Sequence, residues 1–300
     1  MAPGQACNLR EEVIPRLAGR RQVCMTVLKK LTYNPLVIRI VRALGLRRAL
    51  RKAYYAWARP RNGIMPVKLG EFDCRFHVRT PEQLRMVGKA ATGHWRIEVI
   101  RFLNEKLHSG DVIYDIGSNI GICSVFAARK TGATGQVFAF EPAAETYAHL
   151  NDNLQLNGLT NARAFRVALA DYNGEAGLFT GDDLLFSSLV TSRNGQEKSQ
   201  SVRVVQGDRF REEQKLPNPD VVMIDVEGFE KGVMTGLRLT LSDTKCRAII
   251  AEIHPTLLLP GVTGDDILKF LSSCGFAKID TLHWQGIPEF YAIAEREAAR

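Results

Sequence analysis

Five side chains that can bind ligands or exchange protons each stand at or near the end of a short apolar segment of the sequence. They are Asp115, Glu141, Asp225, Glu227 and His254. Short apolar segments are typical of buried parallel strands, and ligands bind outside the carboxyl ends of such strands. We therefore expect the four carboxylates to face one crevice, with His254 at the tip of the next strand.

The first of these acids opens a glycine-spaced turn, which reads Asp115-Ile116-Gly117-Ser118-Asn119-Ile120-Gly121 and joins a strand to a helix. Dinucleotide-binding turns aim backbone N–H groups at a pyrophosphate, and a carboxylate here would repel that anion. The same carboxylate would attract an ammonium group. S-adenosylmethionine (SAM) has no phosphate and carries a cationic amino acid, so the turn favours SAM. Glu141 would then hold the two ribose hydroxyls.

Further residues complete the predicted cofactor site. Gly117 and Gly121 let the backbone come close to a ligand, because glycine has no Cβ. Ala168 and Leu169 end a predicted third strand over residues 164–169 and would form an apolar wall for the adenine. The elements before the domain commonly cover such a pocket, which adds Glu98. The predicted cofactor residues are Asp115, Gly117, Ser118, Asn119, Gly121, Glu141, Pro142, Ala168, Leu169 and Glu98.

Asp225, Glu227 and His254 are the predicted catalytic residues. A methyl group leaves a sulfonium by in-line displacement, so positioning supplies much of the catalysis, and a base near the acceptor would add to it. Asp225 and His254 are the alternatives for that base, ahead of Glu227. The two acids could instead only orient the ligand through backbone amides. The three side chains could also hold a divalent ion, but with no further acidic pair we expect no metal.

The order of apolar segments and helical patterns predicts an α/β fold, a doubly wound and mostly parallel sheet of about seven strands of Rossmann-like type. Thr80-Pro81-Glu82 predicts a helix start. Residues 172–215 predict an antiparallel insertion or a long loop near the mouth of the site, where substrate contact is expected. The expected organisation is a basic helical extension over 1–70, a hairpin and helices over 71–110, and a SAM-binding domain over 111–300.

Charge is distributed unevenly along the chain. Residues 1–70 contain 15 Lys and Arg and two acids, whereas residues 71–300 contain 25 Lys and Arg and 30 acids. Within the basic part, residues 36–57 have apolar positions at helical spacing, with arginines between them. Such a segment can lie on an anionic membrane or pack on the catalytic domain, and both readings stay open. No nucleic-acid motif accompanies the arginines, so we expect no nucleic-acid partner.

Other features predict a cytoplasmic protein. The basic N-terminal segment extends this prediction to peripheral contact with the inner face of the membrane. The apolar runs are too short and too charged to span a bilayer. The first thirty residues lack the apolar centre of a signal peptide. The six cysteines lack the spacing of a zinc site and are expected to be reduced thiols.

Together these motifs resemble those of FkbM-type SAM-dependent methyltransferases, a class I (Rossmann-like) family. The resemblance covers roughly residues 95–260, and Asp225-Val226-Glu227-Gly228 is its most specific part. Its other parts are the turn at 115–121, Phe140-Glu141-Pro142, Val167-Ala168-Leu169, Ser187-Ser188-Leu189 and Glu252-Ile253-His254-Pro255. It implies O-methylation of a hydroxyl on a sugar, glycolipid or other secondary metabolite, with a small-molecule or lipid-linked glycan as acceptor.

Two other functions stay open from the sequence. The same fold could support an NAD(P) or nucleotide-sugar oxidoreductase, although the turn favours a ligand without phosphate. A non-catalytic SAM-binding protein at the membrane would share both the turn and the basic N-terminal segment.

Overall fold

The computed structural model describes residues 55–93, 97–180, 187–188 and 198–297. The chain divides into a unit of residues 1–58 and a unit of residues 59–300. The predicted helical extension over residues 1–70 therefore lies mostly outside the described residues. The elements that carry the site all belong to the second unit.

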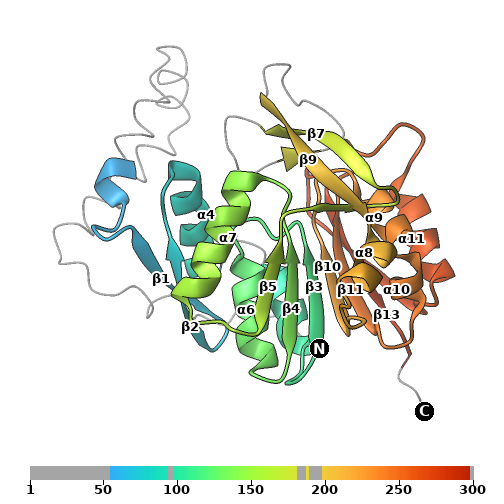
Figure 1. The fold of residues 1–300 in the computed structure, drawn as a ribbon, viewed down its shortest axis with the longest axis horizontal. Coiled ribbons are helices and arrows are strands. Elements are labelled where there is room, and N and C mark those ends of the chain that lie inside the picture. Colours follow the sequence, from blue (N-terminus) through green and yellow to red (C-terminus); the bar gives the residue numbers. More distant parts are fainter. Residues whose placement is uncertain (1–54, 94–96, 181–186, 189–197, 298–300) are drawn as a thin grey trace, which may run out of the picture. The chain divides into compact units, whose positions relative to one another are not determined.

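Seven strands form the central sheet in the order β12-β13-β11-β10-β3-β4-β5 (Figure 1). Their bounds are β3 Val112–Ile116, β4 Gln136–Phe140, β5 Ala162–Phe165, β10 Val221–Ile224, β11 Ala248–Ile253, β12 Lys278–His283 and β13 Phe290–Glu295. The strands from β5 to β11 are parallel, and β13 is antiparallel to both of its neighbours. The predicted fold class is confirmed. Strand order reverses at β3, so its carboxyl end lies at the switch point where this fold binds ligands.

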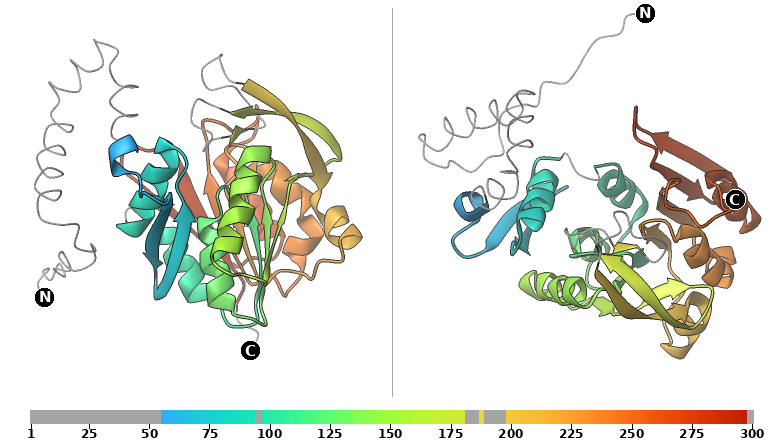
Figure 2. Two further views of the ribbon diagram at one scale, coloured as in Figure 1. Left: turned by 60° about the vertical axis from the view of Figure 1, so that its left-hand side comes forward. Right: turned by 90° about the horizontal axis from the view of Figure 1, so that it is seen from above.

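Helices cover both faces of the sheet (Figures 1 and 2). Their bounds are α4 Pro81–Ala91, α5 Ile97–Lys106, α6 Ile122–Thr131, α7 Ala144–Leu156, α8 Gly207–Glu213, α9 Glu230–Gly236, α10 Arg238–Ser242 and α11 Gly264–Ser273. In Figure 1, α6 and α7 lie on the side of the hairpin β1–β2, and α8 to α11 lie on the other side. The inner strands β3, β10 and β11 are thus buried on both faces, as their continuous apolar sequences require.

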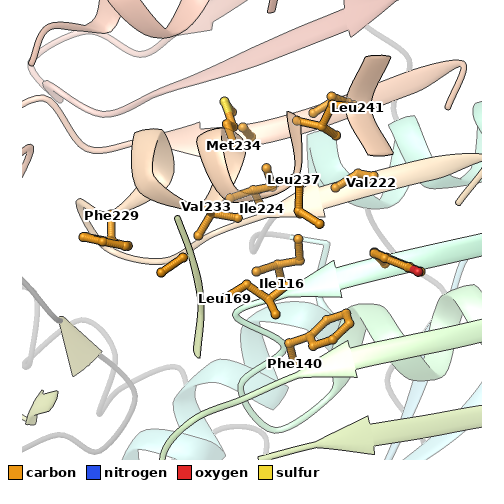
Figure 3. Packing of buried hydrophobic residues seen from close by; sticks show 14 of the residues in the cluster. Ile116, Phe140, Leu169, Val222, Ile224, Phe229, Val233, Met234, Leu237 and Leu241 are labelled. Atoms are coloured by element: carbon orange, nitrogen blue, oxygen red, sulfur yellow. The ribbon is translucent and has the colours of Figure 1, made fainter. Parts of the chain in front are cut away.

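Alternation along β3 shows how the strand serves both faces. Val112, Tyr114 and Ile116 belong to the large apolar cluster that also contains residues of α9, α10 and α11. Figure 3 shows Ile116 packed among Phe140, Leu169 and Val233 in this cluster. Asp115, between two of these positions, points to the opposite face, where it meets Ser124 of α6. The strand thus delivers a carboxylate to the cavity while its neighbours anchor the core.

The hairpin of β1 (Ile64–Leu69) and β2 (Phe72–His77) leads into α4, which begins as predicted. The Thr80 side chain accepts a hydrogen bond from the Gln83 N–H, and Pro81 occupies the first helical turn. Helix α7 binds the edge of β2 that does not pair with β1, since Asn153 Oδ1 accepts a hydrogen bond of 2.8 Å from the His77 N–H. Helix α4 packs on β1 and places Met86 in the wall of a cavity at the carboxyl ends of β3, β4 and β10.

A second sheet, in the order β6-β9-β7-β8, forms the predicted insertion. Its strands are β6 Ala168–Ala170, β7 Gly174–Thr180, β8 Ser187–Ser188 and β9 Lys198–Gln206. β7 and β9 pair antiparallel, as the strand patterns predicted.

The prediction of one strand over residues 164–169 was wrong. The chain leaves the central sheet after Phe165, and β6 pairs instead with β9 in parallel. The cause is a partner more than thirty residues away, which local propensity does not reveal. Helix α8, which directly follows β9, was also not anticipated.

Two further findings concern membrane-spanning helices and disulfides. None of the helices in the described parts of the chain has the length and apolar character needed to span a bilayer. Four cysteines, Cys74, Cys123, Cys246 and Cys274, are buried and free of disulfides.

Candidate active site

One cavity opens at the carboxyl ends of β3, β4 and β10, and most of the predicted residues line it. The lining includes eight of the ten predicted cofactor residues, namely Asp115, Gly117, Ser118, Asn119, Glu141, Pro142, Ala168 and Leu169. Asp225 and Glu227 line the same cavity. Strands far apart in the sequence thus bring together eight predicted cofactor residues and two of the three predicted catalytic residues.

Asp115 is almost fully buried in the cavity wall, with 1% of its surface exposed. Its Oδ2 accepts a hydrogen bond from the Ser124 hydroxyl on α6. The Ser118 hydroxyl donates to the Asp115 carbonyl oxygen over 2.6 Å. The turn therefore holds the main chain of Asp115, and the following helix holds its carboxylate.

The turn brings its backbone against the segment that follows β10. Gly117 has φ 83°, and a Cβ at this position would lie 1.9 Å from the carbonyl oxygen of Asp225. Only glycine permits this approach. Gly121 also has a left-handed φ, 84°, and precedes α6, where a Cβ would lie 2.5 Å from the Leu150 side chain. Gly121 is not among the lining residues, so its role is to let the turn enter the helix beneath the cavity.

Glu141 binds the turn from the next strand. Its Oε2 accepts a hydrogen bond of 3.0 Å from the Asn119 N–H, and its Oε1 accepts one of 2.9 Å from the Ala143 N–H. Each carboxylate oxygen has a second lone pair, so these bonds leave acceptor capacity for ligand hydroxyls. Burial raises the pKa of Glu141 to about 7, against the lowering effect of the two amides. The charges of Asp115 and Asp225 contribute to this rise.

The three predicted catalytic side chains also lie together. Asp225 and Glu227 directly follow β10, and His254 directly follows the neighbouring strand β11. The His254 Nε2 lies 3.4 Å from Glu227 Oε2 and 3.9 Å from Asp225 Oδ1. His254 is not among the residues that line the cavity, so the two acids stand between it and the ligand space.

Glu230, in the first turn of α9, was missed by the sequence analysis. It is fully buried, and its Oε1 lies 2.7 Å from His254 Nδ1. Burial alone lowers the pKa of His254, but the hydrogen bond to Glu230 and the nearby carboxylates outweigh it and raise the pKa to about 9. A glutamate in the first turn of a helix is usually a surface residue that interacts favourably with the helix dipole, so its position in the sequence does not indicate this role.

Other lining residues were also missed. Met86, Ile120, Cys123, Thr146, Leu178, Val226 and Phe229 contribute to the wall. Most are apolar residues at helix or strand positions that look like ordinary core in the sequence. In contrast, Glu98 lies in the first turn of α5 and is not among the lining residues, so its contact with a cofactor stays a prediction.

The arrangement suits a particular kind of ligand. Four carboxyl groups, of Asp115, Glu141, Asp225 and Glu227, line a cavity whose remaining wall is largely apolar. Such a wall attracts a cation that carries hydroxyl groups and an apolar ring, and repels phosphates. The lining of the cavity therefore matches the prediction that the turn favours SAM over a ligand with phosphate groups.

The raised pKa of Glu141 predicts a pH dependence of stability. The native carboxyl, with a pKa of about 7, binds its proton more tightly than in the unfolded chain, with its ordinary value of 4.5. Its contribution to the free energy of unfolding is therefore fully present below pH 4.5 and is lost as the pH rises through 7, by on the order of 3 kcal/mol. Glu141→Gln removes this loss.

Urea unfolding of both proteins between pH 4.5 and 8 checks this prediction. The stability of the wild type relative to Glu141→Gln should fall as the pH rises. Glu145→Gln, which removes an exposed carboxyl from the same region, controls for the loss of one acid. A difference between the wild type and Glu141→Gln that stays constant with pH contradicts the assignment.

Known proteins resemble the chain over the same region. The family model of the methyltransferase FkbM domain matches residues 115–277. Over 229 residues the chain is 30% identical to the hexuronic acid methyltransferase AglP of Haloferax volcanii, and the match covers 72% of this chain and 82% of that protein.

Solved structures of methyltransferases are also similar to the chain. One is a SAM-dependent O-methyltransferase from Thermotoga maritima, with a TM-score of 0.43 at 14% identity, covering 79% of this chain and 78% of that chain. Another is fibrillarin from Aeropyrum pernix in complex with SAM, with a TM-score of 0.39 at 14% identity, covering 63% of this chain and 68% of that chain.

The family match spans more than half of the chain and includes the turn, the end of β4 and the Asp225–Glu227 segment. The predicted family, enzyme class and cofactor are confirmed. The chain belongs to the FkbM methyltransferase family and is a SAM-dependent methyltransferase.

Proposed function

We propose that this enzyme methylates a hydroxyl group of an acidic sugar, a hexuronic acid within a glycan. The observation that carries the proposal is that Asp225 and Glu227 line the same cavity as the donor-site residues Asp115 and Glu141. A proton-accepting group therefore lies beside the place where the methyl group would be presented. The relative from Haloferax volcanii is named for hexuronic acid methylation, which supports the sugar class.

A basic groove beside the cavity supports an acidic acceptor. Arg163, Arg166 and Arg203 line this groove, between β5 and β9. Pro142 and Val167 line both the groove and the donor cavity, so the two spaces adjoin. Guanidinium groups bind carboxylates in a bidentate manner. A sugar that places its carboxylate on these arginines can extend a hydroxyl toward the cavity.

The reaction follows from the donor and acceptor positions. The acceptor oxygen attacks the methyl carbon, the carbon–sulfur bond breaks, and its electron pair stays on sulfur to give S-adenosylhomocysteine. The hydroxyl proton passes to the Asp225 carboxylate, which lines the cavity. His254 does not line the cavity, and its Nε2 lies 3.9 Å from Asp225 Oδ1 and 3.4 Å from Glu227 Oε2. It therefore influences the reaction through these two carboxylates. Asp115 holds the donor's ammonium group, and Glu141 holds its ribose.

Asp115→Asn should weaken SAM binding while the fold persists. The substitution keeps the hydrogen bond from Ser124 but removes the charge that faces the ammonium group. Loss of one charge-assisted contact predicts an affinity about 10- to 100-fold lower. Isothermal calorimetry with SAM measures it, and Asp265→Asn on the exposed surface of α11 is the control. Unchanged affinity in Asp115→Asn rules out this place for the methionine end.

Asp225→Asn should lower kcat by about 10²- to 10⁴-fold, the usual contribution of a general base, and leave the SAM affinity unchanged. The assay uses SAM with an oligosaccharide ending in a hexuronic acid, and mass spectrometry detects the gain of one CH₂ unit. The same oligosaccharide ending in the neutral hexose is the control. A product stable to mild alkali is the expected ether. An alkali-labile ester, or equal rates on the neutral sugar, contradicts the proposed acceptor.

We also propose that the N-terminal segment brings the enzyme to an anionic membrane, where a lipid-linked glycan would be its acceptor. Residues 1–70 contain 15 Lys and Arg but two acids, and this positive charge supports the proposal. The full chain should float with vesicles that contain anionic lipid and remain unbound with neutral vesicles. Replacing Arg47, Arg48 and Arg51 by Gln should reduce flotation. Equal flotation with both vesicle types excludes the electrostatic mechanism.

A further inference from the structure

The tips of β10 and β11 form a cluster of metal-ligating side chains. Asp225, Glu227 and His254 each offer one ligand atom, and these atoms all lie within 4.8 Å of one another. The cluster is buried, since His254 is 3% exposed and Glu227 is 9% exposed. It combines two carboxylates with one imidazole, which is a ligand set that proteins use for divalent cations.

The orientation of His254 provides an independent observation. Its Nδ1 lies 2.7 Å from Glu230 Oε1, and the same oxygen accepts a hydrogen bond of 2.9 Å from the Gly228 N–H. Glu230 is fully buried, so this hydrogen bond fixes the ring. The Nδ1–H donates to Glu230, and Nε2 points to the other carboxylates. Histidines that bind metals are oriented in this way by a carboxylate on the second nitrogen.

The distances around Nε2 suit a shared ion better than a hydrogen bond. Nε2 lies 3.4 Å from Glu227 Oε2, 3.9 Å from Asp225 Oδ1 and 4.0 Å from Glu252 Oε1. A direct N–H···O hydrogen bond is usually about 2.7–3.2 Å long. Two ligand atoms about 2.1 Å from one ion stand between about 3.0 and 4.2 Å apart, depending on the angle. All three separations fall in that interval.

A further carboxylate, that of Glu252, lies near His254. It belongs to β11, two residues before His254, and its Oε2 accepts a hydrogen bond of 3.2 Å from the Tyr291 hydroxyl on β13. With Glu230, four carboxyl groups lie around the His254 imidazole. Like charges brought together in this way repel one another, and a divalent cation between them offsets that cost.

We propose that Asp225, Glu227 and His254 bind a divalent cation, with Glu230 as the positioning residue. The mixed oxygen and nitrogen set suits Mn²⁺. The role of the ion rests on the proposed function, because Asp225 and Glu227 also line the donor cavity. The ion holds the acceptor's hydroxyl oxygen and makes its proton easier to remove. A singly bound Asp225 carboxylate keeps its second oxygen to receive that proton.

The test is Mn²⁺ binding to the full chain after treatment with EDTA, followed by electron paramagnetic resonance. The expected result is saturable binding of one ion per chain. Glu227→Gln should lower the affinity about tenfold or more, and Asp265→Asn on exposed α11 should leave it unchanged. Nitrogen modulation from a bound imidazole should appear in the pulsed spectrum and disappear in His254→Gln. Glu230→Gln, which keeps the shape, should weaken binding without being a ligand.

Two results overturn the inference. One is the absence of saturable Mn²⁺ binding to the wild type, which decides the matter even if a variant fails to fold. The other is nitrogen modulation or affinity that persists in His254→Gln and Glu227→Gln. SAM titrations on the same samples separate this inference from the proposed function. SAM binding and methyl transfer without Mn²⁺ binding refute the cation alone, whereas Mn²⁺ binding without methyl transfer refutes the proposed function.

Discussion

The site depends on the close approach of two backbone segments, the turn after β3 and the segment after β10. Gly117 lies so near the Asp225 carbonyl that no side chain fits between them. The Asp225 N–H donates a hydrogen bond of 2.9 Å to the Ile116 carbonyl, which extends the pairing of the two strands to this point. The predicted cofactor residues of the turn and the predicted catalytic residues after β10 are therefore fixed relative to each other by main-chain contact.

Electrostatics follows from the same approach. The strand ends bring several carboxyl groups into a small buried volume. Burial, and to a lesser extent the charges of Asp115 and Asp225, raise the pKa of Glu141 there. At His254, burial lowers the pKa of the ring, but the hydrogen bond to Glu230 and the nearby carboxylates outweigh it and raise that pKa. A cavity of this charge favours ligands that bring positive charge, such as a sulfonium or a divalent ion. It disfavours the pyrophosphate of a dinucleotide, which separates this enzyme from oxidoreductases of similar fold.

The parts of the site that the sequence predicted are those encoded within a few residues of each other. The Asp115–Gly121 turn joins a strand and a helix, so its spacing alone indicates its shape. Acids at the ends of apolar segments could likewise be placed, since parallel strands end at one edge of the sheet. The missed features depend on distant partners. Glu230 gains its role only through His254, and the division of residues 164–170 between two sheets depends on β9.

The second sheet has a consequence for how this enzyme can diversify. β7 and β9 pair antiparallel up to Thr180 and Lys198, so the intervening chain leaves and returns at adjacent points. Closing a longer excursion between two fixed ends costs little extra entropy. Insertions there can accumulate without moving β3, β4 or β10. The length of the chain between these two strands can thus vary in evolution while the strands that carry Asp115, Glu141 and Asp225 keep their arrangement.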